Sequence, residues 1–160
     1  MIRLSNKNKQ LIGEVRLPSS KSITNRMLIL KKLYEPELIL ENVSLANDSM
    51  VLDKLLNSND NQFDVQDAGT VYRFLTAYCA VTPGEWIIRG TKRLQERPIA
   101  DLISVLRDLG ADITYLEKEG CGPIKIVGKK LIANASLIDI SQIKSSQFAS
   151  ALLMIAPMIE

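Results

Sequence analysis

The sequence contains no histidine and only two cysteines, Cys79 and Cys121, among its 160 residues. The absence of histidine excludes Ser-His-Asp and Cys-His nucleophile systems and metal sites built on imidazole. Because the cysteines form no C-x-x-C motif, we expect two free thiols, with Cys79 as a small core residue. Any chemistry must therefore depend on lysine, arginine, carboxylate and hydroxyl groups, and we expect no metal.

The chain also has little charge imbalance and no long apolar run. Charged residues make up 24% of the sequence and the formal net charge is +2, a balance that is not typical of nucleic-acid-binding proteins or disordered tails. No apolar run reaches the roughly 18 residues of a membrane-spanning helix, and the N-terminus lacks a signal-peptide pattern. We expect a soluble, cytoplasmic domain with no nucleic-acid or membrane partner.

Apolar residues follow helix-like and strand-like spacing in turn along the chain. Helices are predicted over 22–34, from Asn47 or Asp48 to Leu56, from the turn at 67–70 to Cys79, from about Pro98 to Leu109, and over 148–155. Strands are predicted over 11–17, 38–43, 63–65, 86–89, 111–116, 124–127 and 137–140. This order predicts an α/β or α+β fold with mixed sheets.

The first candidate site is a predicted junction of strand, turn and helix in the sequence Leu-Pro-Ser-Ser-Lys-Ser. Ser19 or Ser20 can cap the helix, whose first N–H groups and positive dipole end favour an anion. Lys21 adds a charge, Ser22 a hydroxyl, and Arg26 lies on the same helical face as Ser22. The alternative is an ordinary cap with both cations solvated.

A second helix start of this kind follows the predicted strand 63–65. Gly69 allows the backbone to approach a ligand closely because it has no Cβ, and Arg73 lies three residues after Thr70. The alternative is an ordinary cap, by Asp67 or Thr70, with a structural glycine.

Two further segments carry groups that can bind anions. The loop 90–98 holds three basic residues, and its Arg97 directly precedes a proline near the next helix start. A solvated basic loop is an equal alternative when this loop is considered alone. Ser145, Ser146 and Gln147 form the third hydroxyl-rich helix start. No dinucleotide or P-loop glycine pattern occurs, which argues against a nucleotide cofactor.

Four separated segments together resemble the 5-enolpyruvylshikimate-3-phosphate (EPSP) synthases, the shikimate-pathway transferases of aromatic amino-acid biosynthesis that glyphosate targets. The segments are 17–26, 67–73, 95–99 and 145–154, and they occur in the family's order. The resemblance runs nearly end to end, but it covers only the N-terminal portion of a family chain more than twice as long. The sequence is therefore expected to be a fragment.

The resemblance implies an enolpyruvyl transferase fold of two domains, built from repeated βαβαββ units with mixed sheets and with helices packed inside, that close over the ligands. Residues 1–17 would be a strand segment that pairs with the absent C-terminal domain. Residues 18–160 would form a partial N-terminal domain, with two βαβαββ units and the start of a third.

The resemblance also implies roles for individual residues. The substrate-binding positions that it assigns are Lys21, Ser22, Arg26, Gly69, Arg97, Ser145, Ser146 and Gln147. Lys21 would contact both phosphoenolpyruvate and shikimate 3-phosphate, Gly69 and Arg97 would contact phosphoenolpyruvate, and Gln147 would lie near both. The remaining positions would hold shikimate 3-phosphate.

Three further residues match the family motif and are second-rank candidates for the site: Asp67, Thr70 and Arg73. The resemblance implies that Arg73 supports the loop. Asp67 occupies a position that is often Asn in the family. A carboxylate there would repel an anion unless it pairs with Lys21 or Arg73.

The implied reaction transfers the enolpyruvyl group of phosphoenolpyruvate to the 5-hydroxyl of shikimate 3-phosphate and releases phosphate, without a metal or organic cofactor. The family's acid and base lie in the absent part, so this chain would supply orientation and electrostatic stabilisation and would be inactive alone.

Two alternatives remain. A UDP-N-acetylglucosamine enolpyruvyl transferase typically has Asn after the first lysine and a loop cysteine, whereas this chain has Ser22 and no cysteine between Trp86 and Pro98. The other alternative is a non-catalytic anion-binding domain.

Overall fold

The computed structural model describes residues 12–15, 17–132 and 145–160. The helices are α1 (Lys21–Tyr34), α2 (Asn47–Leu56), α3 (Gly69–Val81), α4 (Lys92–Gln95), α5 (Ala100–Asp108) and α6 (Ser146–Ile155), followed by the 3-10 helix η1 (Ala156–Met158). The strands are β1 (Gln62–Asp64), β2 (Gly84–Arg89), β3 (Asp112–Tyr115) and β4 (Ile124–Gly128). The predicted helices and the strands near 63–65, 86–89, 111–116 and 124–127 are thereby confirmed.

The four strands form one mixed sheet in the order β1-β2-β4-β3. β1 runs parallel to β2, with Phe63 opposite Ile88, and the other two pairs are antiparallel. Such a parallel pair needs a long crossover connection, which α3 supplies. From β1 to β4 the elements follow the order βαβαββ, with the short α4 as an addition, and the expected α/β fold with a mixed sheet is confirmed.

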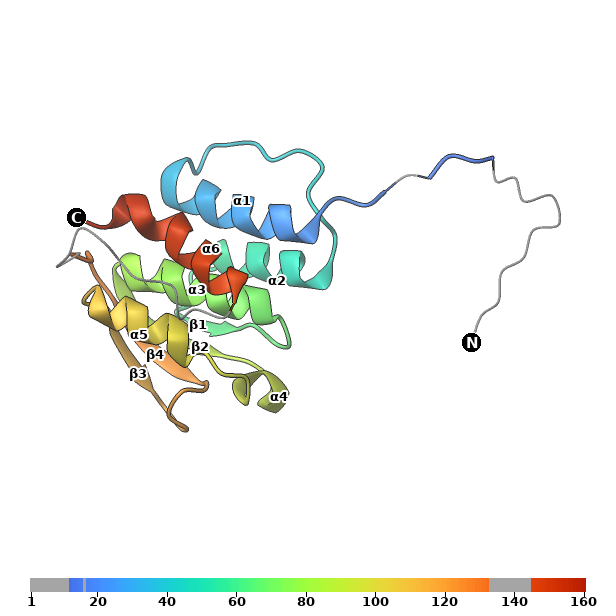
Figure 1. The fold of residues 1–160 in the computed structure, drawn as a ribbon. Helices are drawn as coiled ribbons and strands as arrows, with labels where there is room; N and C mark the ends of the chain where they lie inside the picture. The colour runs from blue at the N-terminus through green and yellow to red at the C-terminus, as the bar shows by residue number, and fades with distance from the viewer. Residues whose placement is uncertain (1–11, 16, 133–144) are drawn as a thin grey trace.

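Helix α3 lies between the sheet and a layer formed by α1, α2 and α6 (Figure 1). Nearly all of its residues are buried, as expected for a helix that is apolar around its whole circumference. Fully buried side chains from α3 and the sheet make the centre of the core: Phe63, Phe74, Leu75, Ile88, Ile124 and Ile126.

The helices of the upper layer run in the same direction. Near the start of α1 and α6, Arg26 Nη2 donates to Ser150 Oγ over 2.8 Å. Near their ends, Tyr34 Oη donates to the Met154 carbonyl over 2.7 Å. Figure 1 shows α2 and α3 running alongside in that direction, so the N-termini of all four helices lie at one end of the molecule.

Two predicted strands are wrong. Neither residues 12–15 and 17, the described part of the predicted strand 11–17, nor residues 38–43 form a strand. The latter segment runs alongside α1 instead: Leu40 is partly buried against the core, and the Ser44 amide donates to Thr24 Oγ1 over 3.0 Å. Leu38, Ile39 and Val43 stay exposed, so the segment neither pairs as a strand nor buries these apolar residues. The predicted strand 137–140 lies outside the described residues.

Two predicted helix starts also differ. The N-cap of α2 is Ala46, whose side chain makes no capping bond, rather than Asn47 or Asp48. Asp48 is instead drawn to a cation on α1, as shown below. The predicted helix near Pro98 begins at Ala100 and is preceded by α4, which the sequence patterns did not indicate.

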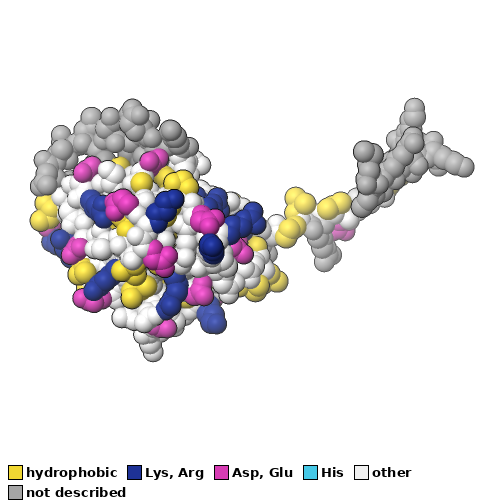
Figure 2. Space-filling model, turned by 90° about the horizontal axis from the view of Figure 1, so that it is seen from below, with side chains coloured by type: hydrophobic (Ala, Val, Ile, Leu, Met, Phe, Trp, Pro, Cys, Tyr) yellow, Lys and Arg dark blue, Asp and Glu magenta, His cyan; other side chains and the backbone are white. Residues whose placement is uncertain are grey.

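Cys79 and Cys121 are free and buried, as predicted, and burial raises the pKa of the Cys79 thiol. In the described part of the chain, no helix is long and apolar enough to cross a membrane. Seen from below, Lys and Arg side chains are interspersed with Asp and Glu side chains over the surface (Figure 2).

Candidate anion-binding site

The start of α1 presents one free hydroxyl and one cation to solvent. Ser20 caps the helix, because its Oγ accepts from the Ile23 amide over 3.4 Å. Lys21 Nζ lies 3.0 Å from Asp48 Oδ2 on the first turn of α2, with 45% of the lysine side chain still exposed. Ser22 is exposed beside it. The Lys21 charge is thus held in place by Asp48 and stays accessible.

Arg26 joins α1 to the two helices beside it. Its Nη1 donates to the Ser22 carbonyl over 2.8 Å, and its Nη2 donates to Ser150 Oγ on α6 over 2.8 Å. The guanidinium lies over the Phe74 ring of α3, 5.2 Å from its centre. Because a guanidinium has five N–H donors, these two bonds leave donors for a bound anion.

Gln147 connects the starts of α3 and α6. Its Oε1 accepts from Arg73 Nη1 over 2.6 Å, and its Nε2 donates to Thr70 Oγ1 over 3.1 Å. Arg73 Nη1 also lies 3.3 Å from the Gly69 carbonyl, and the guanidinium covers the Phe148 ring at 5.2 Å. Arg73 therefore holds two helix starts together.

Gly69 makes room for two guanidinium groups. A Cβ at this position would lie 2.6 Å from Arg97 Nη1 and 3.3 Å from Arg73 Nη1. Burial, and to a lesser extent the neighbouring charge of Arg97, lowers the pKa of Arg73. The α3 N-cap, Ala68, makes no side-chain capping bond in the described structure. The alternative of a cap by Asp67 or Thr70 is therefore wrong, and the first N–H groups of α3 remain available for an anion.

A cavity of about 490 Å³ opens beside Arg97 and is lined by Asp67, Arg93, Leu94 and Arg97. The Asp67 carboxylate accepts a hydrogen bond from the Thr91 hydroxyl. Asp67 is thus paired with a neutral group, and not with Lys21 or Arg73 as the charge argument required.

The start of α6 resembles that of α1. Ser145 Oγ accepts from the Gln147 amide over 3.3 Å and caps the helix, while Ser146 is exposed at its first position. In α1 the capping serine is Ser20, and Ser22 is exposed. In α6 the capping serine is Ser145, and Ser146 is exposed.

The structure thus brings Gly69, Thr70, Arg73, Arg97 and Gln147 together around the starts of α3 and α6. Arg26 is connected to this group through α6 and α3. The starts of α1 and α6 lie at the same end of the helical layer, and they carry Lys21, Ser22, Ser145 and Ser146. Within the described residues, the Lys21 side chain pairs with Asp48 and with none of the other site residues named here.

Sequence reasoning missed several partners of these residues. Ser150 lies four positions after Ser146, on the same face of the helix, so this spacing could have indicated it. Asp48 fits a capping pattern in the sequence, which does not indicate its ion pair with Lys21. Ser49 Oγ donates to the buried Asn25 Oδ1 over 2.7 Å and joins α1 to α2, while Asn25 Nδ2 has no partner within the described residues. No sequence pattern predicts that contact.

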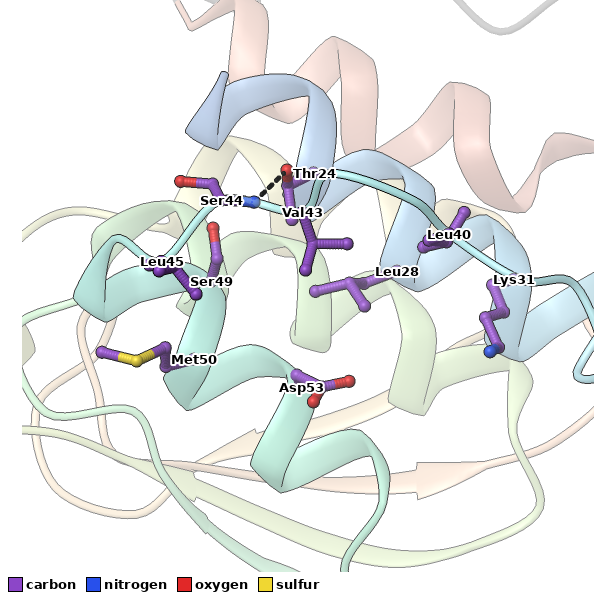
Figure 3. Close-up of a pocket in the computed structure, with 10 residues that line it drawn as sticks. All are labelled: Thr24, Leu28, Lys31, Leu40, Val43, Ser44, Leu45, Ser49, Met50 and Asp53. Atoms are coloured by element: carbon purple, nitrogen blue, oxygen red, sulfur yellow. Dashed lines mark hydrogen bonds between the residues drawn. The ribbon is translucent and has the colours of Figure 1, made fainter. Parts of the chain in front are cut away.

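A separate cavity of about 290 Å³ lies between α1, α2 and the segment that links them. Figure 3 shows Leu28 and Val43 pointing toward one another across it, with the Ser44–Thr24 hydrogen bond at its edge. Among the described residues that line it, none is a predicted site residue. This cavity belongs to the packing of the linking segment and not to the candidate site.

Some known proteins are similar to this chain in sequence, and others in fold. The sequence model of the EPSP synthase (3-phosphoshikimate 1-carboxyvinyltransferase) family matches residues 46–160. A 3-phosphoshikimate 1-carboxyvinyltransferase of Bacteroides fragilis (strain YCH46) is 44% identical over 151 residues, which cover 94% of this chain and 36% of that protein. A 3-phosphoshikimate 1-carboxyvinyltransferase of Colwellia psychrerythraea is 36% identical over an alignment of 174 residues, which covers 92% of this chain and 40% of that protein.

A solved structure of the EPSP synthase from Acinetobacter baumannii has the same fold, with a TM-score of 0.76 at 17% sequence identity, over 92% of this chain and 38% of that chain. This chain spans about 36–40% of the length of the curated relatives named above. The match to the family model includes three of the four motif segments, 67–73, 95–99 and 145–154. The chain belongs to the EPSP synthase family.

Proposed function

We propose that this chain is the N-terminal, substrate-binding part of a cytoplasmic enzyme that transfers the enolpyruvyl group of phosphoenolpyruvate to the 5-hydroxyl of shikimate 3-phosphate. The products are EPSP and phosphate. The observation that supports this proposal best is the convergence of Arg73, Arg97 and Gln147 on the uncapped start of α3. Both substrates carry a phosphate and a carboxylate, and arginines with helix N-termini are the groups that bind such anions.

In this proposal the residues divide between the two substrates. Gly69 and Arg97 contact phosphoenolpyruvate, and Lys21 contacts both substrates. Arg26 and the exposed Ser22 and Ser146 hold shikimate 3-phosphate, together with Ser145 and Gln147. Thr70 and Arg73 keep Gln147 in position through the bonds described above.

The chemistry that this chain supplies is positioning and electrostatic stabilisation. The reaction must protonate the methylene carbon of phosphoenolpyruvate and deprotonate the 5-hydroxyl, and it uses no metal or organic cofactor. We place the groups for this acid–base work in the part of the longer relatives that this chain does not span. Residues 1–17 pair with that part, and residues 18–160 form the partial N-terminal domain with its βαβαββ units.

Isothermal titration with shikimate 3-phosphate tests the binding half of the proposal. Arg26→Ala removes a charged donor, so it should weaken binding by at least about tenfold, and Ser146→Ala should weaken it by a smaller factor. Lys32→Ala, at the exposed far end of α1, and Ser104→Ala, on α5, are the matched controls. Thermal melts must show that each variant is folded.

The outcomes are distinct. If the unmodified chain gives no heat of binding with shikimate 3-phosphate, the chain has only a structural role. Binding of UDP-N-acetylglucosamine in place of shikimate 3-phosphate would favour a UDP-N-acetylglucosamine enolpyruvyl transferase. A steady-state phosphate-release assay on the 160-residue chain should stay near background, because half a cleft neither excludes water nor supplies the acid and base. Measurable turnover would contradict the proposal that the acid and base lie outside this chain.

A further inference from the structure

The turn between β3 and β4, residues 116–123, supports the loop that carries Arg97. Three consecutive residues of this turn, 120–122, contact the segment 95–99, which has Arg97 at its centre. The contacts are those of the Gly122 amide with the Gln95 carbonyl (3.1 Å), of the Ile99 amide with the Gly120 carbonyl (3.0 Å) and of Cys121 Sγ with the Glu96 carbonyl (3.8 Å). The backbone on both sides of Arg97 is therefore fixed to the turn.

The turn in turn lies directly against the side chain of Tyr72, from α3. A Cβ at Gly122 would lie 2.6 Å from Tyr72 Oη and 3.3 Å from Tyr72 Cζ, whereas ordinary contacts begin near 3.4 Å. Tyr72 is only 4% exposed and belongs to the hydrophobic core, so its ring is enclosed. Because Gly122 has no Cβ, the turn can approach α3 closely enough to hold the segment 95–99.

The Tyr72 hydroxyl contributes nothing to this support by hydrogen bonding. It is buried, yet it has no hydrogen-bond partner among the described residues. Burial raises the pKa of Tyr72, so the group stays a neutral donor. A buried donor without a partner costs stability. Removal of this hydroxyl therefore frees space beside Gly122 without breaking a bond.

The position of the turn determines where the Arg97 guanidinium lies. That guanidinium is so close to the start of α3 that a Cβ at Gly69 would lie 2.6 Å from its Nη1. If the turn is pushed away from Tyr72, the segment 95–99 moves with it, because residues 116–119 are exposed and yield before the enclosed ring does. The guanidinium then leaves the start of α3.

We propose that Gly122 is a positioning residue for Arg97: it seats the β3–β4 turn against Tyr72, and the turn holds the guanidinium beside Gly69. Neither Gly122 nor Tyr72 lines the cavity at Arg97, so neither contacts the ligand. This inference rests on the proposed function, since it explains what keeps a phosphoenolpyruvate contact in place.

Two measurements on the 160-residue chain test the inference. In Gly122→Ala the amide and Nε–Hε resonances of Arg97 should shift without any ligand. The affinity for phosphoenolpyruvate, measured by calorimetric titration, should fall by about tenfold, because the charge-assisted contact is misplaced. Tyr72→Phe removes the atom that the new Cβ meets. The double variant Gly122→Ala/Tyr72→Phe should therefore regain the Arg97 resonances, with an affinity within about threefold of the unmodified chain.

A second comparison shows whether Gly122 acts through Arg97. In an Arg97→Gln background, Gly122→Ala should change the affinity by less than about twofold, because the group that it displaces is gone. Ile113→Val removes one methyl group from a buried side chain of β3 and is the control for a mere loss of stability. It should leave the Arg97 resonances and the affinity unchanged. Thermal melts show which variants are folded.

The outcomes separate the inference from the proposed function. Unchanged Arg97 resonances and affinity in Gly122→Ala would overturn the inference, and so would an affinity loss that persists in the Arg97→Gln background. If Gly122→Ala does not fold, the double variant decides: Arg97 resonances like those of the unmodified chain support the inference, and displaced ones contradict it. No binding of phosphoenolpyruvate by the unmodified chain would overturn the proposed function, while the Arg97 resonances would still show whether Gly122 positions the guanidinium.

Discussion

Gly69 is the residue at which the absence of a side chain matters most for the candidate site. A Cβ there would lie 2.6 Å from Arg97 Nη1, which is the far end of a flexible side chain. In Gly69→Ala the arginine moves away and the fold hardly changes, so the free energy of unfolding should stay within about 1 kcal/mol. Phosphoenolpyruvate affinity should fall by about tenfold, because Arg97 leaves its position. Urea unfolding and calorimetric titration measure the two effects, and equal loss of both would show a merely structural glycine.

Asp67 is the residue at which the chain departs from the resemblance to its family, and its charge opposes the ligand. The carboxylate lines the cavity with two arginines and is bonded to the neutral Thr91 hydroxyl. Asp67→Asn keeps the shape and an acceptor oxygen, so it should raise the affinity for inorganic phosphate about threefold to tenfold at low salt.

The gain should shrink as salt is added, because the groups are exposed and screened. Asp112→Asn on the far strand β3 removes an equal charge from an exposed position outside the cavity and is the control. Unchanged or weaker phosphate binding in Asp67→Asn would mean that the carboxylate supports the site through Thr91.

At the scale of elements, the close approach of β4 to α3 depends on Gly128. A Cβ at this residue would lie 1.8 Å from the Thr82 carbonyl oxygen and 2.3 Å from that of Cys79, and both atoms are backbone. Gly128→Ala must therefore separate the strand from the end of the helix, and should lower the free energy of unfolding by at least about 2 kcal/mol. Gly13→Ala, with nothing within 4 Å of its Cβ, should change it little. Equal urea midpoints for the two variants would contradict this packing.

The helices that carry the site could be predicted from local signals, whereas the structure of segment 38–43 and of helix α4 could not. Ser20 and Ser145 cap α1 and α6 as hydroxyl-rich starts predict. The strand predicted at 38–43 was wrong because a short apolar run does not tell whether a second strand lies beside it. Helix α4 was missed because four residues are too few to show a helical period.

The candidate site shows the same limit. Motif spacing placed Arg26, Arg73 and Gln147 within the first two turns of three helices, and the structure has them there. It did not predict which groups they touch: Ser150 lies 124 residues from Arg26, and Gln147 lies 74 residues from Arg73. Such pairs depend on how the helices pack against one another, which no local pattern contains.

At the scale of the whole molecule, large apolar side chains remain exposed on the segment between α1 and α2. Ile39 is 82% exposed and Leu45 is 80% exposed. Large exposed apolar side chains favour association, so the 160-residue chain should self-associate at high concentration. Light scattering after size exclusion should show a dimer or larger species, and the double variant Ile39→Lys/Leu45→Lys should shift it toward monomer. A monomer at all concentrations would contradict this expectation.

The central claim is that the starts of α1, α3 and α6 act on one ligand together. The most direct measurement is a titration of the isotope-labelled chain with shikimate 3-phosphate followed by amide resonances. We predict that the amides of Ser22, Gly69 and Ser146 shift with one common dissociation constant, and that Arg26→Ala weakens all three responses equally. Shifts confined to one helix start, or separate constants for the three, would contradict the account.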